Sequence, residues 1–203
     1  MEKKTRILAI GDIHGDTGLV KKLAKRAKDE KVDLVIIAGD ITFGESSLDN
    51  LIGPFIKENK EVLIIPGNHE SNETINFLAE KYPNTKNIHG YSLIKNNVGI
   101  FGSGTVDWGL DGKASKNLFK ELDKANEKIK GAGKRIMVTH MHPRDSVSEF
   151  SGFPGSNGVK YAIKKLQPDI AICAHIHEAG GITEKVGKTK VIHVARQATI
   201  FDI

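Results

Sequence analysis

Residues 6–15 read RILAIGDIHG, an apolar run that breaks off into glycine, aspartate and histidine. The apolar part, Arg6 to Ile10, has the length and composition of a buried strand. Asp12 and His14 follow that strand directly, and both are side chains that can bind a metal ion. The stretch therefore predicts a strand of an α/β core whose end carries ligating groups.

Four later apolar runs end in the same way. The polar side chains that follow them are Asp40 after residues 34–38, Asn68 and His69 after residues 62–65, His140 after residues 136–139, and His175 and His177 after residues 170–174. In open α/β sheets the carboxyl ends of the strands converge on one edge, where ligands bind. Side chains that are far apart in sequence are therefore expected to be neighbours in space.

The order of the elements predicts a mixed α/β core. Strands and helices alternate in the first half, and short strands cluster at the end, which fits two mixed sheets flanked by helices in a four-layer α-β-β-α sandwich. We expect one domain over residues 1–203. The expected helices cover residues 17–31, 47–59, 72–81, 118–129 and 159–166, and the expected strands cover residues 6–10, 33–38, 61–65, 91–94, 98–101, 135–139, 170–174, 182–186, 191–194 and 199–203. Asp16 or Thr17 could cap the first helix, and Pro54 should kink or shorten the second.

The composition is that of an ordinary globular protein, with 39% hydrophobic and 27% charged residues over 203 positions. The apolar runs are strand-sized and too short to cross a bilayer, and the N-terminus leads straight into a strand, so we expect neither a membrane span nor a secretory signal. The single cysteine, Cys173, needs no oxidising compartment, which favours the cytoplasm. A net charge of +5 favours anionic substrates and tolerates nucleic acid, although the lysines are dispersed over the chain.

The residue types at the strand ends suit a pair of divalent cations. Aspartate, histidine and an asparagine oxygen fit Zn²⁺, Mn²⁺ or Fe²⁺, and one carboxylate can bridge two ions. Two ions about 3.5–4 Å apart would clamp the attacking and leaving oxygens of a displacement at phosphorus. Each motif alone has a structural explanation: Gly39-Asp40 as a turn after a strand, for example, or residues 67–70 as a turn leading to a helix cap. Their joint order favours the metal site.

Taken together, Asp12-x-His14, Gly39-Asp40, residues 67–70 (GNHE), His140 and His175-x-His177 resemble the calcineurin-like metallophosphoesterase superfamily. The resemblance implies a pair of sheets between helices. It also implies two divalent ions, Mn²⁺, Fe²⁺, Zn²⁺ or Ni²⁺, with Mn²⁺ favoured, and hydrolysis of phosphomonoesters or phosphodiesters by a bridging hydroxide. Carried over by position, the first ion would bind Asp12, His14 and His177, the second would bind Asn68, His140 and His175, Asp40 would bridge them, and His69 would be the catalytic histidine.

The chain further resembles the small Icc-like phosphoesterases, whose substrates are generally unclear. Protein phosphatases continue the second motif with an aspartate and an arginine, and residues 41–44 (ITFG) contain neither. The phosphate-binding cation is therefore unassigned, with Arg144 and Arg196 as candidates. His142 could touch the site, and the connections over residues 102–113 and 143–158 could shape the substrate pocket. The expected partner is a phosphoester, with a nucleotide as one option and nucleic acid not favoured. The alternatives are a cyclic-nucleotide phosphodiesterase, a nuclease, or a non-catalytic scaffold like the retromer subunit of this fold.

Overall fold

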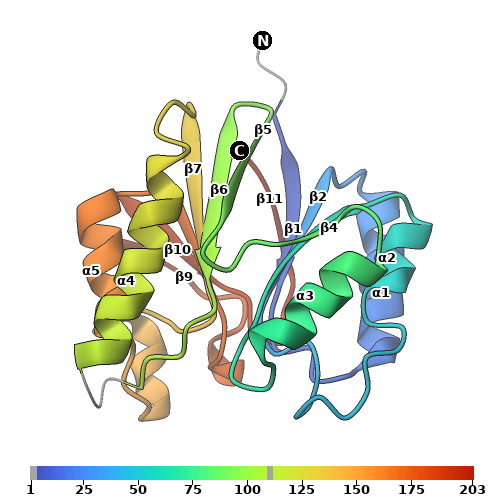
Figure 1. Ribbon diagram of the computed structural model, residues 1–203, viewed down its shortest axis with the longest axis horizontal. Coiled ribbons are helices and arrows are strands. Elements are labelled where there is room, and N and C mark those ends of the chain that lie inside the picture. The colour runs from blue at the N-terminus through green and yellow to red at the C-terminus, as the bar shows by residue number, and fades with distance from the viewer. Residues whose placement is uncertain (1–3, 109–111) are drawn as a thin grey trace.

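Two β-sheets pack face to face in the middle of the molecule, and helices cover the outer face of each (Figure 1). The computed structural model describes residues 4–108 and 112–203. The first sheet has the order β11-β1-β2-β3-β4, formed by Thr199–Asp202, Arg6–Ile10, Leu34–Ala38, Glu61–Ile65 and Thr85–Asn87. The second has the order β5-β6-β7-β8-β10-β9, formed by Ser92–Lys95, Val98–Ser103, Lys134–Thr139, Ile170–Cys173, Thr189–His193 and Thr183–Val186. Both sheets mix parallel and antiparallel pairs, so the expected four-layer fold is confirmed.

The helices divide between the two outer faces. The first sheet carries α1 (Thr17–Asp29), α2 (Gly53–Lys57) and α3 (Asn72–Lys81), and the second carries α4 (Gly112–Glu127) and α5 (Asn157–Leu166). Short 3₁₀ turns lie at Val147–Ser151 and His177–Ala179. None of the helices within the described ranges is long and apolar enough to cross a membrane.

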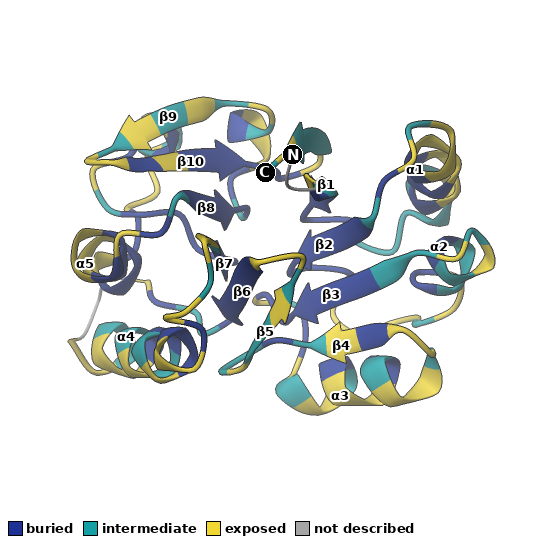
Figure 2. Cartoon of the chain, turned by 90° about the horizontal axis from the view of Figure 1, so that it is seen from above, coloured by how far each residue is buried: buried dark blue, intermediate teal, exposed yellow. Residues whose placement is uncertain are grey.

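Three apolar clusters fill the spaces between the four layers, and the central strands are buried on both faces (Figure 2). Successive residues of β2 show how this works. Ile36 belongs to the cluster between the sheets, whereas Ile37 belongs to the cluster under α1 and α2. Because alternate strand residues point to opposite faces, a strand covered on both sides reads as a continuous apolar run. The runs that end at the polar motifs are therefore the best-buried part of the molecule.

The differences from expectation have local causes. The second helix is much shorter than residues 47–59, because Pro54 occupies its first turn and the preceding residues are not helical. The edge strand β4 was not expected, since its sequence, TKN, has no apolar pattern. The strands expected over residues 91–94 and 98–101 are present as the hairpin of β5 and β6. Asn96 and Asn97 both have positive φ, at 48° and 64°, as a two-residue type I′ turn requires. Residues 1–3 and 109–111, which enter the expectations about the N-terminus and the loop over residues 102–113, lie outside the described ranges.

Candidate metal centre

The loops that follow β1, β2, β3, β7 and β8 meet at one edge of the two sheets. Backbone hydrogen bonds join them: Asp12 N donates to Gly39 O at 3.1 Å, His14 N to Asp40 O at 2.9 Å, and Ala174 N to His140 O at 2.9 Å. These bonds fix the loops to one another within each sheet. All eight side chains expected to form the site lie in the cluster that results, although their roles remain a prediction.

Four of these residues adopt a backbone conformation that side chains other than glycine rarely take. The φ angles are +54° at Asp12, +48° at His14, +50° at Asp40 and +71° at His175. Such a conformation costs about 1 kcal/mol or more per residue and persists where the surrounding structure imposes it. Here it turns the chain sharply after β1, β2 and β8, where these side chains come together in one cluster.

Two glycines allow the loops to approach this closely. A Cβ atom on Gly39 would lie 2.7 Å from His140 Nδ1 and 2.8 Å from the Cα atom of Gly67. A Cβ atom on Gly67 would collide with the carboxylate of Asp40. The glycines of both motifs are therefore needed for packing the loops after β2 and β3 against each other.

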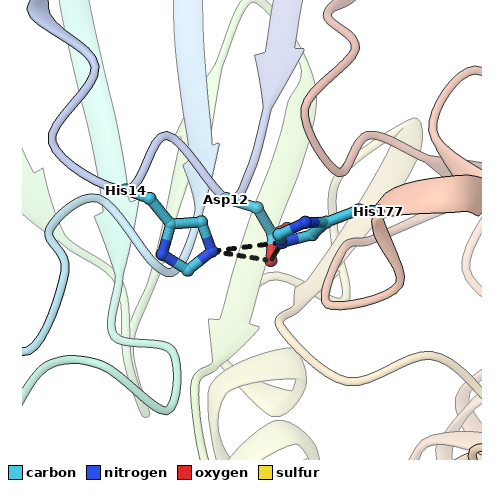
Figure 3. A group of neighbouring side chains, drawn as sticks. All are labelled: Asp12, His14 and His177. Atoms are coloured by element: carbon cyan, nitrogen blue, oxygen red, sulfur yellow. Dashed lines mark hydrogen bonds and ion pairs between the residues drawn. The ribbon is translucent and has the colours of Figure 1, made fainter.

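The first group of ligand atoms comes from Asp12, His14 and His177 (Figure 3). His14 Nε2 lies 3.1 Å from His177 Nε2 and 3.8 Å from Asp12 Oδ1, and His177 Nε2 lies 3.4 Å from the same carboxylate oxygen. Among the described residues, buried Asp12 Oδ1 has no hydrogen-bond partner, whereas Asp12 Oδ2 accepts from His175 N at 2.9 Å. Burial raises the pKa of Asp12, and burial lowers the pKa of His14.

The second group comes from Asp40, His140 and His175, with Asn68 beside it. His140 Nδ1 donates to Ala38 O at 2.9 Å, which leaves the lone pair of His140 Nε2 free. That nitrogen lies 3.0 Å from Asn68 Oδ1 and 3.5 Å from Asp40 Oδ2, so three electron-rich atoms face one point. Burial lowers the pKa of His175 to about 4, which keeps its ring neutral and able to bind a cation.

Asp40 lies between the two groups. Its Oδ2 atom is 3.8 Å from His14 Nε2, 3.5 Å from His140 Nε2 and 4.0 Å from His69 Nε2. Its Oδ1 atom accepts a hydrogen bond from His69 N at 3.0 Å, which fixes the carboxylate. One side chain therefore faces both sets of ligand atoms.

The spacing of these atoms fits divalent transition metals. Two ligand atoms that each lie about 2.1 Å from one ion are about 3.0 Å apart at a right angle and about 3.4 Å apart in a tetrahedron. The closest pairs in the two groups, at 3.1 Å and 3.0 Å, fall at this spacing. A buried carboxylate oxygen without a donor and an imidazole lone pair facing two oxygens are costly unless a cation compensates them.

His69 is oriented by a backbone amide. Its Nδ1 atom accepts from Gly44 N at 3.1 Å, so the ring proton sits on Nε2, which faces Asp40. His69 Nε2 is thus a hydrogen-bond donor at the edge of the ligand cluster.

Glu70 directs its carboxylate away from the His69 ring. The buried carboxylate accepts from the backbone N–H groups of Thr42 at 2.7 Å, Gly67 at 3.0 Å and Asp40 at 3.1 Å, and from the Thr42 hydroxyl at 2.9 Å. Burial raises the pKa of Glu70. The side chain joins the loop that carries Asp40 to the loop that carries His69, a role that no pattern in the sequence indicates.

The remaining candidates lie around the cluster. His142 is fully buried, and its ring is stacked 6.3 Å from that of His175. Arg196 donates to the carbonyls of Asp12 and Ile13 at 3.2 Å and 3.0 Å. These hydrogen bonds stabilise the loop that follows β1. Arg144 pairs with Glu149 at 3.4 Å. Both arginines thus have protein partners of their own.

The two histidines that matched no motif also have protein partners. His193 is fully buried and lies between Glu184 Oε1 at 2.8 Å and Ser148 Oγ at 2.6 Å. His89 accepts from Gly104 N at 3.0 Å. Neither belongs to the groups of ligand atoms described above.

Comparison with solved structures supports the fold. A protein from Thermus thermophilus, TT1561, superposes with a TM-score of 0.79 at 17% identity, covering 98% of this chain and 99% of that one. A dimetal phosphatase from Danio rerio gives a TM-score of 0.66 at 13% identity over 93% of this chain and 86% of that one. A structure described as a novel archaeal phosphodiesterase gives 0.57 at 15% identity over 98% and 100%. At these identities the likeness concerns the fold alone.

The sequence itself matches a known family. No curated protein matches the chain. The model of the calcineurin-like phosphoesterases, in contrast, matches residues 5–179, which span every side chain of the cluster. The chain therefore belongs to the calcineurin-like phosphoesterase family.

Proposed function

We propose that this chain is a two-metal hydrolase of phosphoric esters, with Asp40 shared between the ions. The observation that carries the proposal is the position of Asp40 Oδ2, 3.8 Å from His14 Nε2 and 3.5 Å from His140 Nε2. The two histidines belong to different groups of ligand atoms. The proposed ligands are Asp12, His14 and His177 for one ion, Asn68, His140 and His175 for the other, and Asp40 for both. Mn²⁺ is favoured over Fe²⁺, Zn²⁺ or Ni²⁺, all of which suit nitrogen and oxygen ligands.

Divalent ions at these positions supply Lewis-acid activation of water and neutralise charge on the phosphoryl group. The chain's own residues hold the geometry and assist departure of the alcohol. In the hydrolysis a bond from phosphorus to the water oxygen forms as the water releases a proton to solvent. The bond to the ester oxygen breaks, and that oxygen leaves with the electron pair and takes up a proton from solvent. His69 Nε2–H faces the cluster and donates a hydrogen bond to that ester oxygen, which stabilises the charge that develops there.

The substitution His69→Asn tests this role. Asparagine keeps an acceptor near the position of Nδ1 for Gly44 N–H but has no group at the position of Nε2. We expect a fall in kcat of about 100-fold or more on an aryl phosphate, with metal content unchanged. The matched control is His89→Asn, since His89 also accepts a backbone N–H at Nδ1 but lies outside the cluster. Equal activity of His69→Asn and the wild type would contradict the proposed role.

Metal analysis tests the shared ligand. We expect two ions per chain in the wild type and fewer in Asp40→Asn, together with loss of turnover. Comparing bis(p-nitrophenyl) phosphate with p-nitrophenyl phosphate then separates diesterase from monoesterase activity. If the protein hydrolyses neither ester with any of Mn²⁺, Fe²⁺, Zn²⁺ and Ni²⁺, a non-catalytic scaffold is favoured instead.

The setting of the enzyme follows from less specific features. We take residues 1–203 as one domain, and we place the chain in the cytoplasm because its only cysteine, Cys173, is a buried free thiol. The substrate is a phosphoester, with a nucleotide as one class. Nucleic acid is not favoured.

A further inference from the structure

Two exposed aromatic side chains contact different histidines of the metal centre. Phe43 is 63% exposed, and its ring stacks on that of His69 with centroids 5.0 Å apart and an interplanar angle of 26°. Trp108 is 45% exposed, and its ring meets the ring of His175 edge-on at 5.3 Å. His175 belongs to the second group of ligand atoms, whereas His69 lies at the edge of the cluster beside Asp40. The two aromatic rings thus contact different parts of the cluster.

The position of Phe43 is fixed by its neighbour. Gly44 has a φ of +58° and donates its N–H to His69 Nδ1, so the backbone after Phe43 is tied to the ring that Phe43 covers. The ring of Phe43 also meets that of His14 at 5.9 Å. Phe43 is therefore in contact with the site histidines, while most of the side chain stays in water.

The position of Trp108 is also fixed by its neighbour. The carboxylate of Asp107 is fully buried and accepts from Ser115 Oγ at 2.7 Å, Ser156 Oγ at 2.6 Å and Gly158 N at 3.2 Å. These partners lie in α4 and at the start of α5. The residue that precedes Trp108 is thus anchored to two helices. Trp108 is therefore held beside His175 before a ligand binds, so that binding costs little conformational entropy at this residue.

We propose that Phe43 and Trp108 bind planar rings on the two ester arms of the substrate, which makes the substrate a phosphodiester of the nucleotide class. The inference rests on the proposed function, because the phosphoryl group must lie at the ligand cluster. His69 faces the leaving oxygen, so the leaving arm extends along the ring of Phe43. The other arm extends toward His175 and Trp108. A nucleobase stacks on aromatic side chains of either kind, because every base has a π-face.

Kinetics with paired diesters test each arm separately. Bis(p-nitrophenyl) phosphate has a ring on both arms, whereas methyl p-nitrophenyl phosphate has a ring on the leaving arm only. We expect Trp108→Ala to lower kcat/KM for the first ester by about 5- to 30-fold and to leave the second unchanged. Phe43→Ala should lower kcat/KM for both. Phe77→Ala is the control, since Phe77 is an exposed aromatic on α3 that contacts Lys81.

Fluorescence provides a test that does not depend on turnover. Trp108 is the only tryptophan of the chain, so intrinsic tryptophan emission reports on this side chain alone. In protein loaded with Zn²⁺, adenosine 5′-monophosphate should quench the emission, and ribose 5-phosphate, which has no base, should not.

The outcomes separate the two proposals. Equal effects of Trp108→Ala on both diesters, or equal emission with the two phosphates, would overturn the aromatic contacts and leave the hydrolase proposal standing. Absence of hydrolysis in the wild type would overturn the hydrolase proposal, and base-dependent quenching would then still support binding of a planar ring at Trp108.

Discussion

Replacing Glu70 should separate the two loops that carry Asp40 and His69. Glu70 is only 9% exposed, and its carboxylate accepts four hydrogen bonds, three of them from backbone N–H groups. In Glu70→Ala the three N–H groups lose their acceptor in a space that water does not readily reach. The change removes no predicted metal ligand, so any effect on metal binding comes from the position of the loops.

The size of the effect follows from these contacts. A buried donor left without a partner costs about 1–3 kcal/mol. Three such groups, with some relaxation of the loops, give a loss of about 3–6 kcal/mol in the free energy of unfolding. In a chain of this size 1 kcal/mol shifts Tm by about 2–4 °C, so Tm should fall by about 6–24 °C. Glu70→Gln keeps one acceptor oxygen but turns an NH₂ group toward backbone donors, and we expect a loss of about 1–3 kcal/mol.

Thermal unfolding in the presence of a chelator measures this loss, and metal analysis of the reconstituted variants measures its consequence for the site. Exposed Glu80 on α3 provides the matched controls Glu80→Ala and Glu80→Gln. We expect Glu70→Ala to bind metal more weakly than Glu70→Gln, and both more weakly than the controls. A Tm for Glu70→Ala within about 2 °C of the wild type, with full metal content, would refute the reasoning.

Three further predictions concern buried groups at the site. Asp12→Asn should stabilise the metal-free protein by about 1–2 kcal/mol, because it removes a buried charge whose Oδ1 atom has no hydrogen-bond partner among the described residues. It should also abolish binding of one ion, and thermal unfolding and metal analysis measure the two effects. Burial lowers the pKa of His142 from 6.5 to about 4. The unfolded chain therefore binds the extra proton between these values, and metal-free protein should lose at most about 3 kcal/mol from this ring as pH falls from 6.5 to about 4. His142→Leu should remove this contribution to the fall of the free energy of unfolding at acid pH, measured by denaturant titration at several pH values. A pH dependence equal to that of the wild type would contradict the prediction. Saturation with Mn²⁺ at about 100 times its Kd should stabilise the wild type by about 3 kcal/mol per site, and Asp40→Asn should gain less.

Much of the fold and all members of the cluster could be predicted from the sequence. The reason lies in β1, β2, β3, β7 and β8: each is a buried apolar run, and each ends in a polar residue whose position is set by the sheet edge. An apolar run followed by a polar residue therefore predicts both the strand and the position of that side chain at the sheet edge.

Contacts between loops could not be predicted in this way. Glu70 follows His69 in sequence, yet its carboxylate faces the backbone of Thr42 and Asp40. Gly44 lies 25 positions before His69 and orients its ring through a backbone amide that no residue type reveals. The ring contacts of Phe43 and Trp108 depend on loop conformations that hydrophobic periodicity does not describe.

The ligand cluster draws on both ends of the chain. His14 and His177 face each other at 3.1 Å although 163 positions separate them in sequence. An ion held by both would join two distant parts of the folded chain. Because the ion leaves when the chain unfolds, it would stabilise the fold by mass action, by an amount that grows with the logarithm of the free metal concentration above its Kd. The bound metal would thus link the loop after β1 to the loop after β8, and the concentration of free metal in the cell would set how much of the enzyme stays folded.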